Sequence, residues 1–125
     1  MIDWQIIVEG KFPSGWDEHK DGCWFPDFGT QKYLLPYFDV GEQPIDEYGA
    51  TRFDVDTMKR LRTHLKWQRD YFEAKGDTWV ITETGDGQCE SYTLQRDVVV
   101  GVIDRTISMV GIAIHLNGQL VFRGD

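Results

Sequence analysis

Asp17, His19 and Cys23 lie close together in the sequence, and side chains of these three types bind metal ions. A zinc site needs more ligands than these, and their spacing matches no established zinc pattern. One histidine and one cysteine supply only part of a site. We therefore predict no metal ion and no cofactor, and we interpret the segment as a solvated acidic loop.

Asp104, Ser108 and His115 would share one face of a helix, an arrangement that superficially resembles a nucleophile with its base. Ser108 and His115 would lie roughly 10 Å apart along the helix axis, which is too far for direct proton transfer. Cys89 could instead pair with His64 or His19, but a small cysteine on a hairpin is more often structural. The chain contains no nucleotide-binding, metalloprotease or hydrolase motif. No catalytic residue is predicted.

The charge of the chain is distributed unevenly. Residues 1–50 carry ten acids against three lysines (−7), residues 51–75 carry seven bases against four acids (+3), and residues 76–125 carry seven acids against three arginines (−4). The total is −8 for 125 residues, a length typical of one domain spanning 1–125. An acidic surface repels nucleic acid and anionic membranes. We therefore expect neither as a partner.

Two features, the cysteine content and the N-terminus, favour the cytoplasm, and a third bears on membrane insertion. Two cysteines, Cys23 and Cys89, do not form a disulfide framework. The N-terminus lacks the basic region and apolar run of a signal peptide. The apolar run 98–116 is interrupted by Asp104 and Arg105, and each charge would cost a few kcal/mol in lipid. We expect a buried helix there and not a membrane span.

The segment 54–76 has the strongest periodic pattern. At about 100° per residue, an aliphatic and aromatic stripe faces one direction; it consists of Met58, Leu61, Leu65 and Phe72. Asp54 or Asp56 can cap the first turn, and Gly76 can close the helix in a left-handed conformation. Trp67 and Tyr71 form another stripe, for which we favour contact with the chain's own loops over contact with a partner.

The other elements follow from shorter patterns. Residues 3–12, 31–40 (with Pro36 at an edge), 78–84, 88–93 and 120–122 have strand character, and residues 85–87 can form a hairpin turn. Residues 97–117 fit a helix capped by Asn117 and Gly118 better than two strands, because strict alternation fails. The predicted fold class is α+β: one domain with two main helices (about 55–75 and 95–116) on a small, mostly antiparallel sheet, and long aromatic-rich loops in the first 50 residues.

The first half of the chain also contains the candidate binding surface. Aromatic side chains bury large areas at low entropic cost, and carboxylates steer and pair with a basic partner. The predicted partner-binding residues are Trp16, Asp17, Glu18, Asp21, Trp24, Asp27, Phe28, Glu42, Asp46, Glu47 and Tyr48. In size, acidity and mixed α and β pattern the chain resembles the small cytoplasmic immunity proteins with which bacteria neutralise their own toxins, although no motif carries this resemblance. The leading hypothesis is therefore a non-enzymatic, toxin-neutralising inhibitor that masks a basic partner such as a nuclease.

Two alternatives come from other classes of protein. The first is a small enzyme or ligand-binding domain whose pocket is lined by Trp67, Tyr71 and loop aromatics, with His19 nearby. The second is a structural homodimer through the small residues Gly101, Ser108 and Gly111, although a neighbouring strand of the same chain could fill that groove.

Overall fold

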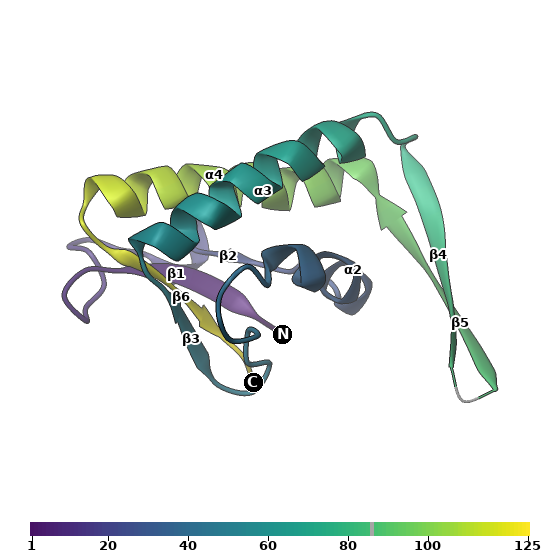
Figure 1. Cartoon of the computed structure of the whole chain (residues 1–125), viewed down its shortest axis with the longest axis horizontal. Coiled ribbons are helices and arrows are strands. Elements are labelled where there is room, and N and C mark those ends of the chain that lie inside the picture. Colours follow the sequence, from purple (N-terminus) through teal and green to yellow (C-terminus); the bar gives the residue numbers. More distant parts are fainter. Residues whose placement is uncertain (86) are drawn as a thin grey trace.

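A computed structural model describes residues 1–85 and 87–125 (Figure 1). The chain forms one α+β fold, as the sequence predicts. Its elements in chain order are β1 (Asp3–Ile7), α1 (Glu18–Asp21), β2 (Cys23–Trp24), α2 (Phe28–Phe38), β3 (Ala50–Phe53), α3 (Val55–Glu73), β4 (Thr78–Gly85), β5 (Gln88–Gln95), α4 (Arg96–His115) and β6 (Gln119–Arg123). Strands β2-β1-β6-β3 form an antiparallel sheet, and β4 and β5 form a separate two-stranded one.

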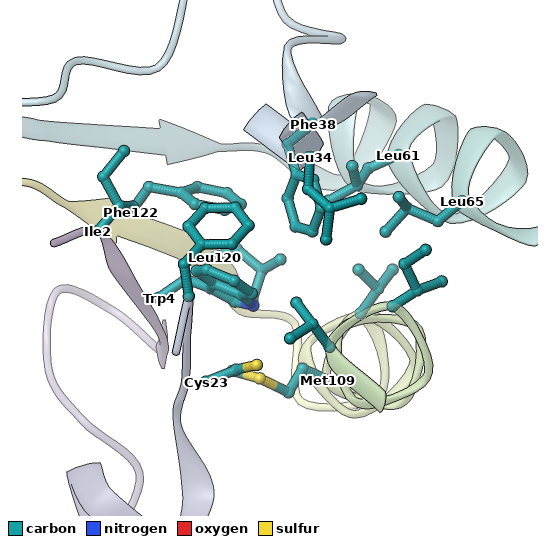
Figure 2. Close-up of a cluster of buried hydrophobic side chains, with 14 of the residues drawn as sticks. Ile2, Trp4, Cys23, Leu34, Phe38, Leu61, Leu65, Met109, Leu120 and Phe122 are labelled. Carbon is teal, nitrogen blue, oxygen red and sulfur yellow. The ribbon is translucent and has the colours of Figure 1, made fainter. Parts of the chain in front are cut away.

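The core lies between one face of the four-stranded sheet and the helix pair α3 and α4 (Figures 1 and 2). Alternation along β1 and β6 directs Trp4, Ile6, Leu120 and Phe122 into this layer, where all four are fully buried. The Trp4 ring contacts the Phe122 ring at 5.4 Å between centroids, and its Nε1 donates a hydrogen bond to Thr106 Oγ1 of α4 at 3.1 Å. The sheet is thereby fixed to α4.

Helix α3 confirms the predicted stripe, because Met58, Leu61, Leu65 and Phe72 are completely buried. Asp54 is the N-cap, and its carboxylate accepts a hydrogen bond from Thr57 N at 2.9 Å. The predicted C-terminus is wrong: the helix ends at an Ala74 cap with right-handed backbone, and Gly76 does not adopt positive φ. Hydrogen bonds from Ala74 N–H to the Asp70 carbonyl and from Lys75 N–H to the Phe72 carbonyl satisfy the last turn without a left-handed residue.

Helix α4 confirms the prediction for residues 97–117, including its cap. Asn117 has φ +56°, and the amides of Asn117 and Gly118 bond to the carbonyls of Ile114 and Ala113, which together form a Schellman motif. By length and composition alone α4 is also the one described helix that could cross a membrane, a test that core helices pass as well.

The prediction of a strand over 31–40 is wrong, because this segment belongs to helix α2. Asp27 caps it, accepting hydrogen bonds from Thr30 N and Oγ1, and Gln31, Leu34 and Phe38 are buried at helical spacing. Pro36 lies in the last turn and faces outward. With α1 and α2 present, the first 50 residues contain more regular structure than predicted.

Strands β4 and β5 form a long hairpin that projects from the helix ends as an arm (Figure 1). The predicted turn includes Asp86, which lies outside the described residues. At the base of the arm, Trp79 stacks on Phe72 with 6.2 Å between centroids. Further out, Lys32 Nζ of α2 contacts Glu83 at 2.6 Å and Glu90 at 3.4 Å. One face of the arm is therefore held against α2, while the other faces outward.

Candidate functional site

The eleven sequence-predicted binding residues fall into three groups in the structure. The β2-edge surface contains Trp16, Asp17, Glu18, Asp21 and Trp24. Asp27 and Phe28 lie at the start of α2, and the β3-edge surface contains Glu42, Asp46, Glu47 and Tyr48, with the neighbouring Asp54 and Asp56. Strands β2 and β3 are the opposite edges of the sheet, roughly 14 Å apart at about 4.8 Å per strand. The sequence predicted one surface where the structure has separate ones.

At the β2-edge surface, several of the predicted residues hold a loop onto the outer face of the sheet. Trp16 Nε1 donates a hydrogen bond to Gln5 Oε1 at 2.8 Å. Glu18 forms an ion pair with Arg123 at 2.7 Å, and the Asp17 carboxylate accepts from the amides that begin α1. These contacts give Trp16, Asp17 and Glu18 structural roles, and Trp16 is only partly exposed.

Arg123 is the electrostatic centre of this outer face. It forms ion pairs with both Asp3 and Glu18, and the hydrogen bond to Asp3 is the main reason why the pKa of Arg123 is raised. Burial by itself raises the pKa of Asp3, but hydrogen bonds from Arg123 and Gln5 outweigh it, so the net shift is downward. The fold thus keeps Asp3 ionised. A cavity of about 370 Å³ beside this network is lined by Asp3, Glu18, His19, Trp24 and Arg123.

That cavity contains neither Trp67 nor Tyr71, so among the described residues it does not combine these aromatics with His19. Trp67 is 79% exposed and Tyr71 is 54% exposed. The expectation that the chain's own loops cover them is therefore wrong.

A more apolar groove of about 270 Å³ separates β2 from α4. Trp24 forms one wall, with the Arg105 guanidinium 5.7 Å from its ring centroid, and Cys23 is buried beside it. Burial raises the pKa of the Cys23 thiol to about 11, which disfavours the reactive thiolate. Gly101 lines the same groove, and a Cβ at Gly101 or Gly111 would meet open space. No neighbouring strand within the described residues fills the small-residue side of α4, which corrects the intramolecular interpretation.

At the start of α2, Asp27 and Phe28 have different roles. The Asp27 carboxylate caps the helix through Thr30, whereas Phe28 is 67% exposed. The segment therefore offers one free aromatic ring beside a carboxylate that is already engaged.

The β3-edge surface is the most open of the three. Tyr48 is 83% exposed, and Asp46 accepts a hydrogen bond from Tyr48 N at 2.9 Å while its own amide donates to Thr51 Oγ1. The loop lies directly on the chain's C-terminal end: a Cβ at Gly124 would stand 2.0 Å from the Glu47 carbonyl oxygen. The loop is thus fixed in place, and its acidic and aromatic side chains point outward.

A polar cavity of about 370 Å³ follows β3 from this loop to the start of α3. Its charged lining residues are Glu42, Arg52, Asp54, Asp56 and Arg60. Hydrogen bonds from Thr57 lower the pKa of Asp54, so this carboxylate stays ionised. With Asp46 and Glu47, five carboxylates stand here against two guanidinium groups.

Sequence reasoning missed Arg52, Asp54, Asp56 and Arg60 as surface residues of one site, because it did not predict β3. It assigned Asp54 only a capping role, which is correct but incomplete. A signal existed: the segment Ala50–Phe53 lies between a turn-rich segment and an N-cap, where a short strand fits.

Taken together, these features define a class: an α+β domain with acidic and aromatic surfaces at its sheet edges. In residues 1–85 and 87–125, no group of three or more His, Cys, Asp or Glu side chains could hold a metal ion. Comparison with protein-family models, curated proteins and solved structures found no match to this chain.

Proposed function

We propose that this protein is a non-enzymatic inhibitor of the immunity type, which binds a basic protein and masks its functional surface. The observation that carries the proposal is the β3-edge surface, where a Tyr48 ring that is 83% exposed stands among carboxylates. Exposed tyrosines are common anchors in protein interfaces, since they bury a large area and offer a hydroxyl at low entropic cost.

Charge supports a basic partner in particular. The chain carries −8 overall, and among the described residues Glu42 and Glu47 have no ion-pair partner within the chain. By contrast Glu18 is already paired with Arg123. Free carboxylates accelerate encounter with a positively charged protein and then pair with its Lys and Arg side chains. The β3-edge surface therefore carries more of the proposal than the β2-edge surface.

The test uses the purified product of the reading frame next to the gene of this protein. We expect a stoichiometric one-to-one complex by light scattering, with loss of whatever activity that product has and no turnover. The triple variant Glu42→Gln, Asp46→Asn, Glu47→Gln should weaken the complex at least ten-fold. The Asp46→Asn substitution keeps a side-chain oxygen that accepts from Tyr48 N, so the loop stays folded.

A matched control removes the same number of charges elsewhere: Glu9→Gln, Asp70→Asn and Glu73→Gln all lie outside the β3-edge surface. It should change binding less than three-fold. The proposal is wrong if a basic product forms no complex, or if both triple variants weaken the complex equally.

A further inference from the structure

The outer side of β3 is an open sheet edge. Among residues 1–85 and 87–125, strand β3 pairs with β6 alone, and Figure 1 shows it as the outermost strand of the sheet. Gly124 N–H donates a hydrogen bond to Gly49 C=O at 2.7 Å, just beyond the registered pair Ala50 and Arg123. This bond determines which residue pairs of β3 and β6 are hydrogen-bonded pairs.

Because hydrogen-bonded and non-hydrogen-bonded pairs alternate in an antiparallel ladder, Thr51 and Phe53 direct their backbone groups toward β6. Ala50 and Arg52 direct theirs outward. Neither of these outward amides bonds to another residue in the part of the chain that the structure describes. Two residues thus present N–H and C=O groups in the geometry that an incoming strand requires.

We infer that the β3 edge receives an extended, basic segment of the partner protein, which adds to the sheet as a fifth strand. The inference rests on the proposed function and specifies how the partner is held. Backbone pairing with Ala50 and Arg52 supplies affinity, and the cavity beside the edge receives alternate side chains of the segment.

Charge explains why the segment is basic. The five carboxylates of the β3-edge surface outnumber the guanidinium groups of Arg52 and Arg60. The Arg52 side chain lies on the face of the sheet away from the core. Successive side chains of a strand alternate between faces, and those of its neighbours Thr51 and Phe53 lie on the core face. Successive side chains of an added strand point to opposite faces. The pattern that fits is therefore a basic residue at every second position, with uncharged residues between.

Other occupants and other edges fit less well. A second copy at the same edge would bring two sets of five carboxylates together, at an energetic cost. Strand β2 is only two residues long and lies beside α4. The arm has longer edges, but the exposed residues on its outward face are uncharged; they are Thr78, Val80, Thr82, Thr84, Cys89, Ser91, Thr93 and Gln95. That face gives no reason to select a basic strand.

The test adds a synthetic probe to the full chain: an acetylated and amidated eight-residue peptide in which Lys alternates with Val and Thr. The readout is amide hydrogen exchange followed residue by residue. We expect exchange at Ala50 and Arg52 to slow at least ten-fold, with little change at Thr51 and Phe53, which are already bonded to β6. A peptide of the same composition with its lysines in one block should bind at least five-fold more weakly.

A backbone variant tests the same pairing through the Ala50 amide. Ala50→Pro removes one outward N–H and leaves the bonds to β6 intact, so it should weaken the probe about five-fold, the factor for one hydrogen bond of ~1 kcal/mol. Ala50→Val keeps the N–H and should bind within two-fold of the unmodified chain. If Ala50→Pro fails to fold, the exchange pattern of the unmodified chain decides alone.

The outcomes separate this inference from the proposed function. Absence of probe binding overturns strand addition. Binding that protects amides elsewhere, for example Val80 and Thr82 of β4, also overturns it but leaves recognition of a basic partner in place. The proposed function itself fails only if the basic product of the neighbouring gene does not bind, or binds without regard to the acidic surface.

Discussion

Replacing Phe72 with alanine should destabilise this protein far more than replacing Trp67, although both are aromatic residues of the same helix. Phe72 is completely buried, and its ring contacts those of Tyr33, Tyr37 and Trp79, with centroids 5.7, 5.6 and 6.2 Å away. Phe72 therefore joins α3 to both α2 and the arm. Removing such a side chain costs about 4 kcal/mol, from lost burial and the cavity left behind.

This cost is a large part of the total stability of a domain, which is typically about 5–15 kcal/mol. With a urea dependence of ~2 kcal/mol per molar, Phe72→Ala should lower the unfolding midpoint by roughly 2 M. Trp67→Ala should move it by less than roughly 0.3 M, because substitutions at exposed positions change stability by about 0.5 kcal/mol or less. Both substitutions raise helix propensity by a similar amount, so the difference between their midpoint shifts measures the packing of the two side chains.

The assay is equilibrium urea unfolding followed by circular dichroism, which does not depend on the tryptophan that is removed. Equal midpoint shifts for the two variants would refute the reasoning. A large effect of Trp67→Ala in dilute solution would mean that its ring is covered, and a concentration dependence of the shift would then identify a second copy as the cover.

Three further predictions concern polar and titratable groups of the fold. Thr106→Val should cost about 1–3 kcal/mol in urea unfolding, because the buried Trp4 N–H loses its acceptor at 3.1 Å; a Thr106→Ser variant that behaves like valine would contradict this. At pH 8, iodoacetamide should label exposed Cys89 but not buried Cys23 in the folded chain, and equal labelling of both thiols would be inconsistent with the fold. Because burial raises the pKa of Cys23 from 9.0 to about 11, the folded state favours the protonated thiol, and the free energy of unfolding should fall as pH rises from 9.0 toward 11. Because the net pKa shift of Asp3 is downward, its contribution to the free energy of unfolding is present above its unfolded pKa and is lost on acidification. Asp3→Asn should therefore lose less stability than the unmodified chain between about pH 5 and 2. Urea midpoints of the two chains that fall in parallel over this range would contradict this prediction.

The parts of the fold with strong periodicity were predictable from the sequence. Helix α3 has a buried stripe and an aspartate cap, and Asn117 marks the end of α4 as the structure has it. Helix α2 was missed because residues 31–40 were interpreted as a strand with Pro36 at an edge, although the spacing of Gln31, Leu34 and Phe38 is helical. The order β2-β1-β6-β3 could not be predicted, since β1 and β6 come from opposite ends of the chain.

The candidate site was predictable in composition but not in position. Trp24, Phe28 and Tyr48 are exposed, but whether an acid is free or engaged depends on contacts between distant residues. Glu18 is neutralised by Arg123, which lies far from it in the sequence. The open edge at β3 also depends on pairing with β6, which a four-residue strand does not reveal by itself.

The most direct measurement of the central claim is the association rate with the neighbouring gene product, taken by stopped flow at several salt concentrations. Attraction between the acidic surface and a basic partner predicts an association rate that falls steeply with ionic strength. The dependence of this rate on ionic strength should be shallower for the triple variant Glu42→Gln, Asp46→Asn, Glu47→Gln than for the control triple variant. An association rate that does not depend on salt, or that has the same slope in both variants, would contradict a basic partner at the β3-edge surface.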